Sequence, residues 1–193
     1  MHGILAEARR WCEGRSWLVR LPLAAVLLYA FARHLADTEH QDLFKPLNLG
    51  IHELGHYVFA PLGVFLSVAG GSLLQCAAPV AAAVMFARQK DYFAITVACQ
   101  WLGMNLFDVA LYAGDARTQA LPLVSPGGGG GHIIHDWNYL LDATGLLLWD
   151  STLAGVLRGA AVITSAAGAA AGAWLLGQMA RSGAAPWTSG RNP

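Results

Sequence analysis

The sequence predicts an all-α fold, a polytopic membrane helix bundle of five or six spans that forms a single domain over residues 1–193. Composition is the first reason: 55% of the residues are hydrophobic and 12% are charged, about half the charged share of an ordinary soluble domain. The mean hydropathy of +0.44 agrees with this. Long uncharged stretches are the third reason, because a membrane helix takes about 20 apolar residues, so the chain has room for about six.

The N-terminal segment is basic and leads into the first span, expected over residues 16–33. Its four arginines, against two glutamates, predict a cytoplasmic N-terminus under the positive-inside rule. We interpret the span as an uncleaved membrane anchor rather than a signal peptide. These arginines are Arg9, Arg10, Arg15 and Arg20.

The next block, residues 46–87, contains one formally charged side chain, Glu53. We expect it to hold a helix with the motif described below, a turn at Gly70, Gly71 and Ser72, and a second membrane helix. A further span is expected over residues 92–113, with Asn105 inside it.

The last third of the chain begins with a loop over residues 114–136 that contains five consecutive glycines. Residues 137–180 are expected to hold one or two spans. The stretch 137–149 is either a short span or a half-membrane helix, whereas 159–180 is an uncharged span whose alanines and glycines allow close helix packing.

Charge and cysteine content exclude several classes of protein. The formal net charge is zero, with 12 basic and 12 acidic residues, so nothing indicates nucleic-acid binding. Three cysteines without paired spacing predict neither a disulfide framework nor a zinc knuckle. The expected partners are membrane lipid and a membrane protein or peptide substrate.

The motif that carries chemistry is His52-Glu53-Leu-Gly-His56. On a helix, histidines four residues apart lie one turn apart and direct two nitrogens at one metal ion. Zn²⁺ acidifies its bound water, and Glu53 is placed to take the proton from that water. Ionisable groups are costly in a membrane segment and usually functional there, so the pattern predicts amide hydrolysis.

A catalytic zinc ion needs a third protein ligand, and the candidates are Asp108, Asp115, His132, His135 and Asp136. The pair His135-Asp136 is the best placed, because it opens a helix directly after the flexible glycine loop. Asp136 is also suited to cap that helix.

The segment GIHELGHYVFA around this motif resembles the site-2 protease family of intramembrane zinc metalloproteases. In that family an aspartate on a later helix is the third ligand. The resemblance implies that Asp136, 80 residues after His56, holds that position, with His135 and Asp115 as alternative ligands. It also implies that the stretch 70–75 is an extended element that pairs with substrate. Here the aspartate stands in His-Asp-Trp, without the family's flanking Gly or Pro.

The resulting expectation is a membrane-embedded zinc metallopeptidase with Glu53 as its catalytic base and Asn105 as a possible substrate contact. A membrane metal carrier or sensor, a non-proteolytic zinc-site protein, and a hydrolase of another amide remain alternatives. The compact chain favours a bacterial inner membrane. The oligomeric state cannot be predicted from the sequence.

Overall fold

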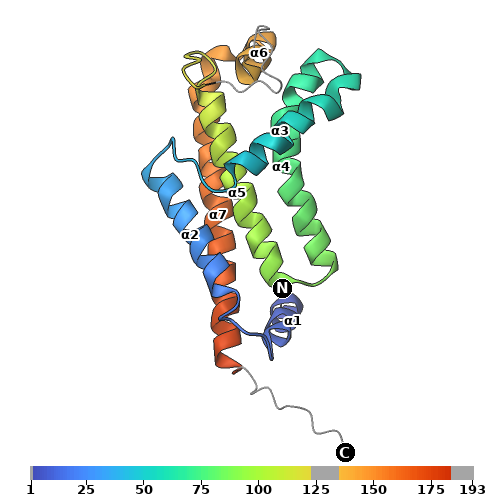
Figure 1. Cartoon of the computed structure of the whole chain (residues 1–193), viewed down its shortest axis with the longest axis vertical. Coiled ribbons are helices and arrows are strands. Elements are labelled where there is room, and N and C mark those ends of the chain that lie inside the picture. Colours follow the sequence, from blue (N-terminus) through green and yellow to red (C-terminus); the bar gives the residue numbers. More distant parts are fainter. Residues whose placement is uncertain (1, 123–134, 184–193) are drawn as a thin grey trace, which may run out of the picture.

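The structure is a computed structural model that describes residues 2–122 and 135–183, and Figure 1 shows the chain as a helical bundle. In the described part every regular element is a helix. In chain order these are α1 (His2–Cys12), α2 (Leu21–Ala36), α3 (Lys45–Phe59), the short 3₁₀ helix η1 (Ala60–Leu62), α4 (Val64–Arg88), α5 (Tyr92–Gly114), α6 (Asp136–Ala143), the 3₁₀ helix η2 (Leu147–Trp149) and α7 (Asp150–Arg181).

Three stretches among the described residues are long and apolar enough to cross a membrane: α4, α5 and the 35 residues Leu147–Arg181 that contain α7. The 23 residues of α5 rise about 34 Å, close to the roughly 30 Å thickness of the hydrocarbon layer. The shorter apolar helix α2 has 16 residues. Three long spans, rather than the expected five or six, therefore stand out by length and composition in the described part. The span expected over 92–113 matches α5.

The turn expected at Gly70, Gly71 and Ser72 was wrong, since all three residues lie inside α4, and the stretch 70–75 is helical rather than extended. The chain instead reverses direction at η1 and Gly63, whose φ of +99° favours glycine. The two glycines of α4 serve packing. A Cβ atom on Gly70 would lie 2.6 Å from the carbonyl oxygen of Gly55 in α3, so the two helices meet backbone to backbone.

Residues 137–149 fall in α6, which begins at Asp136 and is eight residues or about 12 Å long, and in η2. The last three of them, Leu147–Trp149, begin the apolar stretch Leu147–Arg181. The final helix α7 begins at Asp150, nine residues before the uncharged stretch 159–180 that the sequence pointed to.

Close packing of α7 against α5 agrees with the small residues seen in the sequence. A Cβ atom on Gly103 would lie 1.9 Å from Ser165 Oγ, and one on Gly168 would lie 2.9 Å from Cγ of Gln100. Each glycine therefore lets a neighbouring helix approach where a methyl group would clash.

The two ends of the bundle differ in what they carry. At one end, Ala8 and Cys12 of α1 pack against Phe93 at the start of α5 and Leu175 near the end of α7. Lys90 Nζ lies 2.6 Å from Glu7 Oε1, which joins α1 to the α4–α5 turn. The opposite end carries α6 and the α3–α4 turn (Figure 1).

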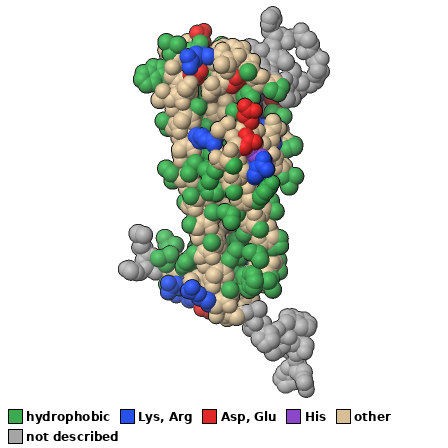
Figure 2. All heavy atoms as spheres, turned by 90° about the vertical axis from the view of Figure 1, so that its left-hand side faces the viewer, with side chains coloured by type: hydrophobic (Ala, Val, Ile, Leu, Met, Phe, Trp, Pro, Cys, Tyr) green, Lys and Arg blue, Asp and Glu red, His purple; other side chains and the backbone are tan. Residues whose placement is uncertain are grey.

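Helix α2 runs from the α1 end to about the middle of the bundle, and α3 continues from there toward the α6 end (Figure 1). Two polar side chains at this break, His34 and Asp42, are buried and have partners in the protein, whereas Asp37 and Glu39 are exposed. His34 Nε2 lies 2.9 Å from Asp42 Oδ2, and Arg158 Nη2 donates to the His34 carbonyl oxygen at 2.7 Å. Irregular backbone is tolerated at membrane depth where protein groups satisfy it in this way. Figure 2 shows charged side chains in the upper half of this face and at its lower end, with an apolar band between them.

Candidate metal centre

The face of α3 that packs on α4 carries both histidines of the motif. His52 is buried, and its ring lies directly over Gly71, where a Cβ atom would come within 2.5 Å of Nε2. Gly55, one turn along, is in backbone contact with Gly70. Glycine at these positions therefore leaves the room in which the His52 ring lies.

Asp136 of α6 completes the group, because its carboxylate points at both histidines. Asp136 Oδ2 lies 2.9 Å from His52 Nε2 and 3.3 Å from His56 Nε2. The ligand atoms of the three residues lie within 4.8 Å of one another. The structure thus brings together three of the residues named from the sequence, although 80 positions separate His56 from Asp136.

The second ring nitrogen of each histidine faces an oxygen acceptor. His52 Nδ1 lies 3.0 Å from Gln75 Oε1, and His56 Nδ1 lies 2.9 Å from the Ser67 carbonyl oxygen. Both Nδ1 atoms therefore carry the ring hydrogen and donate it. If both rings are neutral, the two Nε2 lone pairs therefore point at Asp136 Oδ2. This oxygen is itself a hydrogen-bond acceptor, so none of the three atoms supplies a hydrogen.

Three lone-pair donors that face one another need a cation, or additional protons on the rings, to be stable. The donor set matches zinc, which takes imidazole nitrogens and carboxylate oxygens at 2.0–2.2 Å in tetrahedral geometry. Ligands at that distance are roughly 3.3 Å apart along a tetrahedral edge, close to the two contacts of Asp136. Mg²⁺ and Ca²⁺ prefer all-oxygen sites and fit this set less well.

Further side chains hold the group in place. Gln75 is buried and Asn105 is fully buried, and the Asn105 amide donates to the Gln75 carbonyl oxygen at 2.8 Å. The Gln75 side-chain amide in turn faces Asn105 Oδ1 at 3.4 Å. Tyr112 Oη accepts from the Asp136 backbone N–H at 3.0 Å. Outer partners of this kind fix ring orientation in metal sites.

The Asn105 side chain, named from the sequence as a possible substrate contact, is engaged with Gln75. Sequence reasoning missed Gln75, Ser67 and Tyr112. A polar side chain such as Gln75 in an uncharged span was the one available signal.

The alternative ligands His135 and Asp115 lie next to each other, within ion-pair distance but without a hydrogen bond from His135 Nε2 in the described part of the chain. His135 Nε2 lies 3.4 Å from Asp115 Oδ2, and His135 Nδ1 accepts from the Asn138 backbone N–H at 3.2 Å, so His135 caps α6. Asp136 follows as the first residue of that helix.

Asp115 is further occupied by the chain that follows α5. Its carboxylate accepts from the backbone N–H groups of Ala120 and Leu121, each at 2.9 Å, and from the Thr118 hydroxyl. Burial raises the pKa of Asp115, but these hydrogen bonds outweigh it and lower the pKa below its ordinary value.

Asp108 is also engaged, since its Oδ1 lies 3.1 Å from Lys45 Nζ. His132 and the five glycines 127–131 lie outside the described residues.

Glu53 occupies the position between the two histidines and is half-buried. Within residues 2–122 and 135–183, its carboxylate has no hydrogen-bond or ion-pair partner. An uncommitted carboxylate next to two metal-ligand candidates is what a general base requires.

Comparisons of the chain with protein-family models, with curated proteins and with solved structures give no match.

Proposed function

We propose that this chain is a membrane-embedded zinc metallopeptidase of the site-2 protease-like type. The observation that carries the proposal is the convergence of His52 Nε2, His56 Nε2 and Asp136 Oδ2, with both Nδ1 atoms already donating elsewhere. His52, His56 and Asp136 would hold the ion. A tetrahedral zinc site with three protein ligands keeps its fourth position for water, which is the arrangement of catalytic sites.

Each residue has a defined task in peptide hydrolysis. A zinc ion bound here would supply an acidified water and polarise the substrate carbonyl. Glu53 takes the proton of the attacking water and passes it to the leaving amine. Gln75 and the Ser67 carbonyl hold the two imidazoles in the tautomer that leaves Nε2 free, and Tyr112 fixes the start of α6.

We further propose that α2 and α3 together make one crossing, so that the chain crosses four times and both described ends lie on one side. Seven of the 12 basic residues then lie at the α1 end, which makes that end cytoplasmic. Arg88 and Lys90 fall on this side, as the charge rule requires. The seven are Arg9, Arg10, Arg15, Arg20, Arg88, Lys90 and Arg181.

The test of the peptidase is Glu53→Gln in the full chain, reconstituted in liposomes with a set of single-span synthetic peptides. We expect cleavage to fall by at least about 100-fold, because general-base catalysis contributes 10²–10⁴-fold. Zinc content should stay near one ion per chain. The control is Glu39→Gln, which alters an exposed carboxylate between α2 and α3. Cleavage retained by Glu53→Gln would contradict the mechanism.

A metal carrier is the alternative function. The buried polar groups of Asp108, Asn105 and Gln75 lead toward His52 and could line a path. The Lys45 ammonium at the far end of this row repels a cation, so the row gives a carrier less support. Zinc flux into proteoliposomes without peptide cleavage would favour the carrier.

A further inference from the structure

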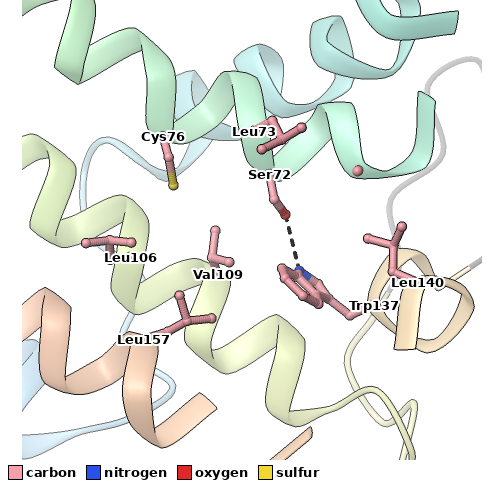
Figure 3. A pocket seen from close by; sticks show the side chains of 9 residues that line it. Ser72, Leu73, Cys76, Leu106, Val109, Trp137, Leu140 and Leu157 are labelled. Atoms are coloured by element: carbon pink, nitrogen blue, oxygen red, sulfur yellow. Dashed lines mark hydrogen bonds between the residues drawn. The ribbon is translucent and has the colours of Figure 1, made fainter. Parts of the chain in front are cut away.

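A second feature of the bundle is an apolar pocket of about 230 Å³ between α4, α5, α6 and α7 (Figure 3). Leu106 lies on α5, Leu140 on α6 and Leu157 on α7, while Ser72 and Cys76 line it from α4. None of these residues belongs to the metal-ligand group described above.

The lining of the pocket selects apolar ligands. Its two polar groups capable of strong hydrogen bonds are already paired with each other, because Trp137 Nε1 donates to Ser72 Oγ at 3.2 Å (Figure 3). Cys76 adds a weakly polar thiol, and the remaining lining side chains are hydrocarbon. The Ser72 hydroxyl hydrogen is the one strong donor that the described lining residues leave for an entering polar group, whereas an apolar group meets hydrocarbon over most of the lining.

The size of the pocket matches one large side chain. An apolar protein cavity of roughly 150 Å³ is enough to bind benzene. The volume here therefore admits the side chain of Leu, Ile, Met or Phe. A complete lipid acyl chain is much larger than this space.

The pocket lies next to the candidate metal centre, because two of its lining residues directly follow residues of that centre in the sequence. Ser72 follows Gly71, which lies against the His52 ring. Trp137 follows Asp136, whose carboxylate faces both histidines. A peptide whose carbonyl lies at His52, His56 and Asp136 therefore has α4 and the start of α6 beside it, and the residues that directly follow Gly71 and Asp136 line the pocket.

We propose, on the basis of the proposed peptidase function, that this pocket is a specificity subsite that receives one large apolar side chain adjacent to the bond that is cleaved. The substrate class is then a membrane-embedded peptide with Leu, Ile, Met or Phe at that position. Peptides with Gly or Ala there leave the pocket unfilled.

The first experiment compares two tryptophan substitutions on consecutive residues of α7. Leu157→Trp fills the pocket, while Val156→Trp is its matched control because Val156 is 65% exposed on the outside of the bundle. The synthetic peptides differ only in the residue beside the cleaved bond, which is Leu, Phe or Ala.

For the wild type and for Val156→Trp we expect kcat/KM to be at least about 1,000-fold higher for Leu than for Ala, since each added carbon in an apolar pocket is worth roughly 10-fold or more and Leu has three more than Ala. For Leu157→Trp we expect the preference to fall below 10-fold, with cleavage of the Ala peptide retained. An unchanged preference in Leu157→Trp overturns the subsite.

The second experiment measures occupancy of the pocket in a variant that is expected not to cleave the peptide. Glu53→Gln protein in liposomes is treated with a maleimide, and the labelling of Cys76 is followed with and without peptide. The Leu peptide should slow labelling of Cys76 at least fivefold, and the Ala peptide should not. Cys99 on α5 lies outside the pocket lining and serves as the internal control.

The two experiments separate the two proposals. Protection of Cys76 by the Leu peptide, together with absence of cleavage by the wild type, would overturn the peptidase and keep the pocket as an apolar peptide site. Cleavage without side-chain preference and without protection would overturn the subsite alone. Slower labelling of Cys76 in liposomes than in detergent, with no further slowing by the Leu peptide, would identify an acyl chain as the occupant and also overturn the subsite.

Discussion

Histidine and carboxylate side chains meet at three places in the described part of the chain, and the places differ in how many imidazoles share one carboxylate. His34 faces Asp42 at 2.9 Å, and His135 faces Asp115 at 3.4 Å. In each pair one imidazole faces one carboxylate, and at His34 the ring N–H can donate to Asp42 Oδ2. At the third place two imidazoles share one oxygen of Asp136.

The two kinds of site also differ in whether protein groups satisfy the carboxylate. Asp42 also accepts from the Phe44 backbone N–H at 2.7 Å, and the His34 ring stacks on Phe107 with 4.9 Å between centroids. That pair is satisfied by protein groups alone. At Asp136 the two Nδ1 hydrogens are directed away, to Gln75 and Ser67, so the shared carboxylate oxygen needs either a cation or additional protons on the two Nε2 atoms. Contact between one histidine and one aspartate thus does not define a metal centre, whereas two imidazoles that converge on one carboxylate oxygen define a candidate.

Removing a carboxylate from each kind of site should give the largest contrast. Asp136→Ala should lower zinc affinity by more than the 10–100-fold that loss of an outer partner typically costs. Asp42→Ala should leave zinc binding unchanged, because its carboxylate serves only the break between α2 and α3. Competition with a fluorescent zinc chelator measures both variants. Equal zinc affinity in the two variants would remove the distinction between the sites.

A methyl group at Gly71 should give the next largest effect. In Gly71→Ala the new Cβ would lie 2.5 Å from His52 Nε2, so the ring must move and zinc affinity should fall about 10–100-fold, as for other disturbances of ligand orientation. Gly50→Ala is the matched control on α3, since nothing lies within 4 Å of the place that its new methyl group would take. Both are helical glycines, so helix propensity changes alike. An effect of the same size in Gly50→Ala would contradict the account.

Loss of the Tyr112 hydroxyl should have a smaller effect. Tyr112→Phe removes the acceptor for the Asp136 N–H, a hydrogen bond worth about 0.5–1.5 kcal/mol, so zinc affinity should fall roughly 2–10-fold. Tyr139→Phe on α6 is the control, because its hydroxyl has no partner among the described residues. The same titration measures both, and an unchanged affinity in Tyr112→Phe would show that the contact does not position the ligand.

The smallest expected effect is on the pH dependence of stability when the Asp115 carboxylate is removed. The pKa of Asp115 is lower in the folded chain than its ordinary value of about 3.9, so its contribution to stability is complete above that pH and is lost as the pH falls through the folded pKa. Asp115→Asn should lower Tm by a constant amount between pH 5 and 7. The difference from wild type should shrink below about pH 4. A difference that grew on acidification would mean that the sign of the shift is wrong.

The sequence predicted which side chains converge better than the path of the chain. The spacing of His52 and His56 follows from helix geometry, whereas the choice of Asp136 over His135 and Asp115 came from the family resemblance. Gly70 and Gly71 were misread, because a glycine pair signals either a turn or a close helix contact and one sequence does not distinguish them. Gln75, Ser67 and Tyr112 act through contacts between helices, which no local pattern reveals.

The charge rule was also hard to apply from the sequence. Counting α2 and α3 as separate spans places Arg88 and Lys90 on the outside, against the rule. The contact of Lys90 with Glu7 shows instead that the α4–α5 turn lies beside α1. A crossing shared by two shorter helices has no signature in a hydropathy pattern, because each half falls below the length of a span.

The central claim is that two imidazoles and one carboxylate form a zinc centre, and X-ray absorption at the zinc edge of the full chain tests it most directly. We predict one zinc ion per chain with about four light-atom ligands at 2.0–2.2 Å, two of them imidazoles, and in His52→Ala either a weaker imidazole signal or loss of the zinc ion. A chain that takes up no zinc, or a zinc ion with six oxygen ligands unaffected by His52→Ala, would contradict it.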